Sequence, residues 1–185
     1  MIVIAGAPGS GKSAIFPVQH LGIDFFNADD RAAELNRGSY FSIPQEIRSR
    51  VNREFETFIA EHIVAQRTFA FETTLRSAIT FDQAHLAKMA GFVTDMRYLA
   101  LDNVERNLSR VKSRADKGGH SASERVLRAI REASLRNLPR ALREFDRVRV
   151  YDNTAWKGAP ELVLESISGQ IVFQKLPPPA WLRLP

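Results

Sequence analysis

The chain of 185 residues carries a net charge of +5, and 44% of its residues are hydrophobic while 25% are charged, as in ordinary globular domains. The absence of cysteine from the sequence excludes disulfide bonds, thiolate metal sites and a cysteine nucleophile. No stretch approaches the roughly 20 apolar residues of a membrane span, and the first apolar run stops at Gly6, which favours a strand over a signal peptide. These features predict a cytoplasmic protein of one domain without membrane contact.

The chain begins with a short apolar strand, Met1–Ala5, followed at once by a glycine-rich segment and then a helical pattern. That segment, Gly6-Ala7-Pro8-Gly9-Ser10-Gly11-Lys12-Ser13, fits the pattern G-x-x-x-x-G-K-[ST] in full. Glycines let successive backbone N–H groups curl around a phosphate, and the following helix presents its positive end to the same charge. A glycine-rich turn that binds nothing is the alternative, but the strand and helix on either side favour a phosphate-binding P-loop.

Each position of such a loop has a chemical role. The cradle for ATP would be built from Gly6, Gly9, Ser10 and Gly11. Lys12 would neutralise oxygens of the β- and γ-phosphates, and Ser13 would ligate Mg²⁺. Pro17, early in the following helix, is expected to kink or shorten that helix because proline lacks a backbone N–H donor.

Two carboxylates, Asp29 and Asp30, follow the second predicted strand, Ile23–Asn27, at the start of a helical stretch. Transfer of a phosphoryl group to an alcohol needs a base or orienting group for the hydroxyl, and either carboxylate can supply it. Carboxylates in this position are equally suited to cap the helix. The residue pattern alone leaves both roles open.

The third predicted strand, Thr68–Thr73, ends in polar residues. Glu72, Thr74 and Arg76 alternate along the chain, and in an extended chain alternate residues share one face. Three polar groups pointing together would suit an acceptor rich in hydroxyl groups. The alternative is a Glu72–Arg76 ion pair on the surface, which contributes little to stability.

The remaining predicted elements are helices over residues 44–63, 77–90, 103–112 and 124–145, and strands over residues 92–101, 147–151 and 171–174. Pro139 is expected to bend or split the last of these helices. Strands that alternate with helices predict an α/β fold, with a mostly parallel sheet and helices on both faces. Ligands of such sheets bind at the carboxyl ends of the strands, where every motif above falls.

Residues 1–175 would form one P-loop domain, and residues 176–185, with three consecutive prolines, an extended or disordered tail. Asp152-Asn153-Thr154 ends the strand after the long basic helix. We expect the base of the nucleotide near this segment, with Asn153 as its contact. A plain turn is the alternative, since all three residue types suit turns.

Positive charge is concentrated in one half of the chain. Between residues 97 and 149, fourteen Lys and Arg residues outnumber seven Asp and Glu residues, so this stretch carries +7. Such a stretch suits phosphates or nucleic acid. A binder of single-stranded nucleic acid interleaves aromatic residues with its basic ones, and only Tyr98 and Phe145 are aromatic here, which disfavours nucleic acid as a partner.

Arg106, Arg110 and Arg114 recur every four residues on one helical face. Like charges placed in this way destabilise a helix unless an anion faces them. The loop after them, Ala115–Ser123, contains two adjacent glycines. This combination predicts a basic lid over residues 103–145 that closes over phosphates, with a solvated helix face as the alternative.

Six stretches match, in the same order, the zeta-toxin-like small-molecule kinases: G-A-P-G-S-G-K-S, N-A-D-D-R, F-E-T-T-L-R, V-E-R, S-R-A-D-K-G-G-H and S-L-R-N-L. They are spread over most of the length of residues 1–140, and F-E-T-T-L-R and the G-G-H loop are much more specific than the P-loop pattern. The chain therefore resembles that family. The resemblance implies a nucleoside-kinase-like fold with ATP and Mg²⁺ as cofactors, and an antitoxin protein as a partner to test for.

By this resemblance Asp29 is the general base for the acceptor hydroxyl, and Arg106 and Arg114 are lid arginines on the phosphates. The residues that would hold the acceptor are Glu72, Thr74 and Arg76. The toxins of the family phosphorylate UDP-N-acetylglucosamine at a sugar hydroxyl. This chain departs from them after His120, where it reads S-A-S in place of V-P, and it lacks the extra helices expected around a nucleotide-sugar.

The sequence therefore predicts an ATP- and Mg²⁺-dependent phosphotransferase that acts on a hydroxyl of a small molecule, with a nucleotide-sugar as one acceptor. One alternative is a metabolic or nucleic-acid 5′-hydroxyl kinase on the same fold. Another is a nucleotide switch that acts through a partner or nucleic acid. A switch needs no acceptor pocket, so the E-T-T-L-R stretch favours the kinase.

Overall fold

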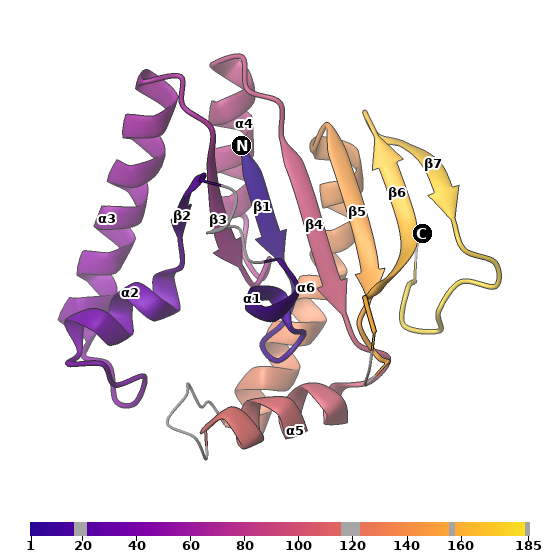
Figure 1. The fold of residues 1–185 in the computed structure, drawn as a ribbon, viewed down its shortest axis with the longest axis horizontal. Coiled ribbons are helices and arrows are strands. Elements are labelled where there is room, and N and C mark those ends of the chain that lie inside the picture. Colours follow the sequence, from indigo (N-terminus) through magenta and orange to yellow (C-terminus); the bar gives the residue numbers. More distant parts are fainter. Residues whose placement is uncertain (17–21, 116–122, 156–157, 184–185) are drawn as a thin grey trace.

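The structure, a computed structural model, describes residues 1–16, 22–115, 123–155 and 158–183. Within these ranges seven strands form one sheet in the order β2-β3-β1-β4-β5-β6-β7 (Figure 1). The strands are β1 (Ile2–Ala5), β2 (Asp24–Phe26), β3 (Phe69–Thr73), β4 (Asp95–Ala100), β5 (Arg147–Asp152), β6 (Glu161–Ile167) and β7 (Gln170–Gln174). The strand that leads into the P-loop, β1, therefore lies inside the sheet.

The first five strands run parallel to one another, which confirms the predicted mostly parallel sheet. β1 pairs with β3 and β4, while β2 pairs with β3 and β5 pairs with β4. The last two strands are antiparallel, β6 to β5 and β7 to β6. β7 corresponds to the strand predicted over residues 171–174. β6 was not predicted, and it extends the sheet on the side away from β2.

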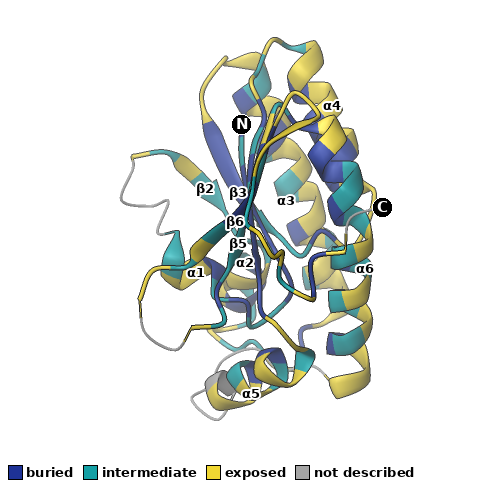
Figure 2. Cartoon of the chain, turned by 90° about the vertical axis from the view of Figure 1, so that its right-hand side faces the viewer, coloured by how far each residue is buried: buried dark blue, intermediate teal, exposed yellow. Residues whose placement is uncertain are grey.

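Helices cover the two faces of the sheet unequally. The helices in the described ranges are α1 (Lys12–Ile15), α2 (Ala28–Leu35), α3 (Gln45–Val64), α4 (Ile79–Met89), α5 (Val104–Ala115) and α6 (Glu124–Glu144). α3, α4 and α6 lie against one face and the short α1 lies on the other (Figure 2). α5 crosses beneath the carboxyl ends of the central strands (Figure 1). None of these described helices is both long and apolar enough to cross a membrane.

The main core lies between the sheet and the helices α3, α4 and α6. It includes Phe69, Phe71, Tyr98 and Phe145. The first three come from parallel strands, which are buried on both faces and therefore appear as apolar runs in the sequence, and Phe145 follows the end of α6.

α6 continues through Pro139 as one helix, so the predicted split there is wrong. Proline removes a single N–H donor, and packing against the sheet keeps the rest of the helix in place.

The C-terminal segment also differs from the expected extended or disordered tail. Trp181 and Leu182 are buried and belong to the main core. The indole N–H of Trp181 donates a hydrogen bond of 2.7 Å to a carboxylate oxygen of Asp152, at the end of β5. Trp181 and Leu182 therefore anchor this segment on the core, while Leu176, Pro177 and Pro178 before them are exposed.

Candidate active site

The glycine-rich segment forms a tight loop between β1 and α1, as the sequence predicts. Gly9 and Gly11 have φ angles of 76° and 98°, in the left-handed region that L side chains rarely adopt. A Cβ atom on Gly9 would lie 2.5 Å from the carbonyl oxygen of Asn107, and one on Gly11 would collide with the amide of Asn153. The two glycines are thus required both by backbone geometry and by the close approach of α5 and of the segment after β5.

Two asparagines hold this loop from outside. The amide nitrogen of Asn107, in α5, donates to the carbonyl oxygen of Pro8 at 2.8 Å, and that of Asn153 donates to the carbonyl oxygen of Ser10 at 2.8 Å. Both side chains are buried, with exposed fractions of 3% and 7%. The amide nitrogen of Asn153 is therefore engaged with the loop, and its predicted contact with the nucleotide base stays a prediction. The role of Asn107 was not predicted from the sequence.

Replacing Asn153 with alanine is expected to lower nucleotide affinity about tenfold. The change leaves the buried carbonyl of Ser10 without its donor, which costs on the order of 1–3 kcal/mol of stability. Calorimetric titration with nucleotide and a thermal melt measure the two effects. Asn52, on the exposed surface of α3, supplies the matched control, since Asn52→Ala removes an amide without a partner among the described residues. Equal nucleotide affinity in both variants would contradict the role of Asn153 in shaping the loop.

Lys12 and Ser13 meet at one carboxylate, that of Glu72. The ammonium of Lys12 donates to the carbonyl oxygens of Gly6 at 2.8 Å and of Ala7 at 3.3 Å, and it lies 3.4 Å from Oε1 of Glu72. The hydroxyl of Ser13 donates to Oε2 of Glu72 at 3.0 Å. Glu72 reaches this place because β3 lies beside β1, with Glu72 in register with Ile4. The cradle therefore has its own acidic residue next to the predicted metal ligand.

The chain turns sharply after β3, so the expected extended run through Arg76 is not formed. The strand ends at Thr73, and Leu75 is buried with a φ of 56°. The N–H of Leu75 donates to the hydroxyl of Thr73 at 3.1 Å, and its carbonyl accepts from the amide of Asn137 in α6 at 2.9 Å. Glu72 and Arg76 form no ion pair, and Arg76 is exposed. Binding of the acceptor by Glu72, Thr74 and Arg76 stays a prediction.

The two aspartates at the start of α2 have different surroundings. The helix is capped by Asn27, whose side-chain oxygen accepts from the backbone N–H groups of Asp29 at 3.0 Å and of Asp30 at 3.4 Å. The carboxylate of Asp30 accepts from the hydroxyl of Tyr40 at 2.8 Å. The carboxylate of Asp29 has no hydrogen-bond or ion-pair partner among the described residues. Neither aspartate side chain caps the helix, which leaves Asp29 available for chemistry.

Two of the three predicted lid arginines contact the segment after β5. Nε of Arg106 lies 3.0 Å from a carboxylate oxygen of Asp102, and its Nη1 donates to the carbonyl of Thr154 at 3.4 Å. Nη2 of Arg110 donates to the carbonyl of Asn153 at 3.0 Å, beside the P-loop. The backbone of Arg114 belongs to α5, but its side chain lies outside the described part of the structure. So do residues 116–122, which make up most of the predicted lid loop.

α5 is also tied to α6 at its first turn. The guanidinium of Arg128 lies 3.0 Å from the carboxylate of Glu105. A backbone N–H hydrogen bond, and then the Arg128 guanidinium, hold the pKa of the Glu105 carboxyl below its ordinary value. Both side chains are exposed, so water screens the pair and it contributes little to stability.

Comparison with known proteins shows similarity in fold. None of the known family models matches the chain. An uncharacterized protein of Haemophilus influenzae is 27% identical over 128 residues, which make up 69% of this chain and 89% of that protein. The crystal structure of the complex of AvrRxo1-ORF1 and AvrRxo1-ORF2 with ATP superposes with a TM-score of 0.70 at 18% identity, over 92% of this chain.

A structure of the PezAT chromosomal toxin–antitoxin system of Streptococcus pneumoniae superposes with a TM-score of 0.61 at 16% identity, over 83% of this chain and 68% of that one. The present chain spans only 59% of the chain it matches in the AvrRxo1 complex. Together with the P-loop at the end of β1 and the parallel strands around it, these similarities show that the chain has a P-loop NTPase fold.

Proposed function

We propose that the chain is an ATP- and Mg²⁺-dependent phosphotransferase whose acceptor is a hydroxyl group of a small molecule. The observation that carries the proposal is the contact of both Lys12 and Ser13 with Glu72 inside a glycine cradle. Mg²⁺ takes oxygen ligands and in phosphoryl-transfer sites usually binds one or two protein groups besides the phosphates. The hydroxyl of Ser13 and the carboxylate of Glu72 provide such a pair of oxygens, so the site fits the metal.

Each residue of the site has its own role in this proposal. The cradle and Lys12 would hold the phosphates, while Arg106 and Arg114 would bring positive charge from α5. Mg²⁺-ATP, when bound, supplies the phosphoryl group and screens its negative charge. Asp29 would accept the proton of the acceptor hydroxyl, because its carboxylate is exposed at the end of β2 and has no partner among the described residues. Phosphoryl transfer depends mostly on this positioning and charge stabilisation.

The acceptor is best sought among nucleotide-sugars, UDP-N-acetylglucosamine first, because the sequence resembles zeta-toxin-like kinases. The similarity to a toxin–antitoxin system, at the level of the fold, supports testing for an antitoxin protein as well. The experiment is incubation of the chain with ATP, Mg²⁺ and a panel of nucleotide-sugars, alcohols and RNA 5′-hydroxyl ends, read by mass spectrometry. A phosphorylated small molecule supports the proposal. Hydrolysis of ATP with no phosphorylated acceptor would favour the nucleotide switch, and phosphorylated RNA ends would favour the nucleic-acid kinase.

Glu72→Gln should separate a metal-binding role of Glu72 from an acceptor-binding role. If Glu72 helps to hold Mg²⁺, the loss of its charge should lower the affinity for Mg²⁺-ATP by roughly tenfold, a difference of about 1.4 kcal/mol. The affinity measured with excess chelator should change much less. Glu56→Gln, on the exposed surface of α3, is the matched control. Unchanged Mg²⁺-ATP affinity with a raised KM for the acceptor would instead assign Glu72 to the acceptor.

A further inference from the structure

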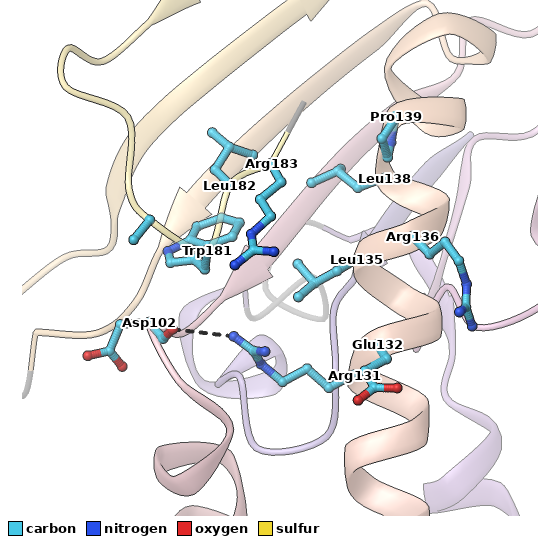
Figure 3. Close-up of a pocket in the computed structure, with 11 residues that line it drawn as sticks. Asp102, Arg131, Glu132, Leu135, Arg136, Leu138, Pro139, Trp181, Leu182 and Arg183 are labelled. Carbon is cyan, nitrogen blue, oxygen red and sulfur yellow. Dashed lines mark hydrogen bonds between the residues drawn. The ribbon is translucent and has the colours of Figure 1, made fainter. Parts of the chain in front are cut away.

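A second cavity lies outside the P-loop, between α6 and the C-terminal segment (Figure 3). Its volume is about 790 Å³, within the range of roughly 300–1,000 Å³ that small-molecule sites occupy. None of the residues that line it belongs to the P-loop. α6 also covers the face of the sheet opposite to α1, so this cavity is separate from the phosphate cradle (Figure 2).

One part of the cavity wall is apolar, and charged residues of α6 and of the C-terminal segment form much of the rest. The apolar part is formed by Leu135 and Leu138 of α6 and by Trp181 and Leu182 of the C-terminal segment, and all of these except Leu135 are largely buried in the main core. The indole of Trp181 is fixed in place, because its N–H is bonded to the Asp152 carboxylate. The parts of the leucines and of the fixed indole that reach the cavity offer a small apolar group a place to pack.

Two guanidinium groups face this apolar space, Arg131 from α6 and Arg183 from the C-terminal segment (Figure 3). Arg131 donates only to backbone carbonyls, those of Leu101 at 3.0 Å and of Asp102 at 3.4 Å. Arg183 has no hydrogen-bond or ion-pair partner on its side chain among the described residues. Neither guanidinium forms an ion pair with a carboxylate in the part of the chain that the structure describes, although the charge of Arg131 helps to lower the pKa of the Glu105 carboxyl.

The acidic residues at the cavity do not supply the missing negative charge. The carboxylate of Asp102 lies 3.0 Å from Nε of Arg106 and points away from the cavity, and that of Glu132 is turned away from Arg183 (Figure 3). Arginine is the side chain best shaped to bind a carboxylate or phosphate and also to stack on an aromatic ring. A partly apolar wall with two guanidinium groups that form no ion pair suits an anion that carries an apolar part.

We propose that this cavity binds a small organic anion, with its apolar part packed against Leu135 and Trp181 and its carboxylate or phosphate on Arg131 and Arg183. The proposal is independent of the proposed function, since it concerns binding and not transfer. The cavity is lined by Asp102, two residues before α5, and by Trp181, which is bonded to Asp152 at the end of β5. Asn153, the residue after Asp152, contacts the P-loop.

Trp181 makes the test direct, because the sequence contains only one other tryptophan, Trp156. The probe is the aromatic sulfonate 8-anilinonaphthalene-1-sulfonate, added to a Trp156→Phe variant of the full chain. Energy transfer from excited Trp181 to the bound probe should rise and then saturate, as expected for one site. Phenyl phosphate and phenylacetate should displace the probe, whereas the neutral 2-phenylethanol should not. The stronger of the two anions identifies a phosphate or a carboxylate as the natural headgroup.

Arg183→Gln should weaken probe binding roughly tenfold, as expected for the loss of one charge-assisted hydrogen bond. Arg143→Gln, an equal charge change on α6 outside the cavity, should leave binding unchanged. The same titrations with Lys12→Ala should give the same affinity, which separates this site from the P-loop. Displacement by ATP in a competitive manner, equal displacement by 2-phenylethanol, or equal binding to the Arg183→Gln and Arg143→Gln variants would each overturn the proposal.

Discussion

Replacing Lys12 with alanine is expected to lower the rate of phosphoryl transfer by a factor on the order of 10²–10³ while the protein stays folded. Loss of a single preorganised donor at a developing charge has an effect of this size in other enzymes. The ammonium of Lys12 is held in place by the carbonyls of Gly6 and Ala7 and by Glu72, so its charge is already positioned before a nucleotide binds. Removing it also leaves Glu72 without its positive neighbour.

The measurement is the rate of acceptor phosphorylation, together with a thermal melt and a nucleotide titration on the same preparations. Lys112→Ala is the matched control, because Lys112 is an exposed lysine on α5. This control should keep its rate, and both variants should melt as cooperatively as the original chain. A Lys12→Ala enzyme with nearly full activity would remove the central claim about the P-loop, whatever the acceptor proves to be.

The parts of the fold that the sequence predicted are those whose signals are local. The P-loop is specified by a contiguous pattern, and the parallel strands are apolar runs bounded by helical patterns. β6 was missed because its sequence, E-L-V-L-E-S-I, mixes charged and apolar residues and so shows no clear apolar run. Its strand conformation depends on pairing with β5, which no local pattern displays.

The contacts that were missed join residues far apart in the sequence. Asn153 is 143 residues from Ser10, and Asn107 is 99 residues from Pro8, so neither contact could be inferred from spacing. Asparagine in a helix interior is disfavoured by propensity, and this gave a weak signal at Asn107. The turn at Leu75 breaks the expected alternation because a left-handed conformation at a leucine requires tertiary support, which α6 provides.

The last prediction separates a kinase from a switch, and it depends on Asp29. A general base must reach the acceptor hydroxyl within about 2.6–3.2 Å, directly or through one water, and it contributes typically 10²–10⁴ in rate. Asp29→Asn keeps size and polarity but cannot take the proton. In a kinase this change should lower transfer to the acceptor by about that factor, while the affinity for Mg²⁺-ATP stays close to its original value.

Asp30→Asn is the matched control, because it makes the same chemical change on the next residue of α2. An asparagine at this position can still accept the hydrogen bond from Tyr40, so stability and transfer should both be nearly unchanged. If Asp29→Asn weakened the binding of Mg²⁺-ATP, Asp29 would be a metal partner alongside Ser13, and Glu72→Gln would then show which carboxylate matters more. If Asp30→Asn were inactive and Asp29→Asn active, the family motif would be displaced by one residue. Normal transfer by both variants would exclude Asp29 as the base and assign deprotonation of the acceptor to another group. Hydrolysis of ATP without transfer to any acceptor, by the original chain and by both variants, would favour the switch.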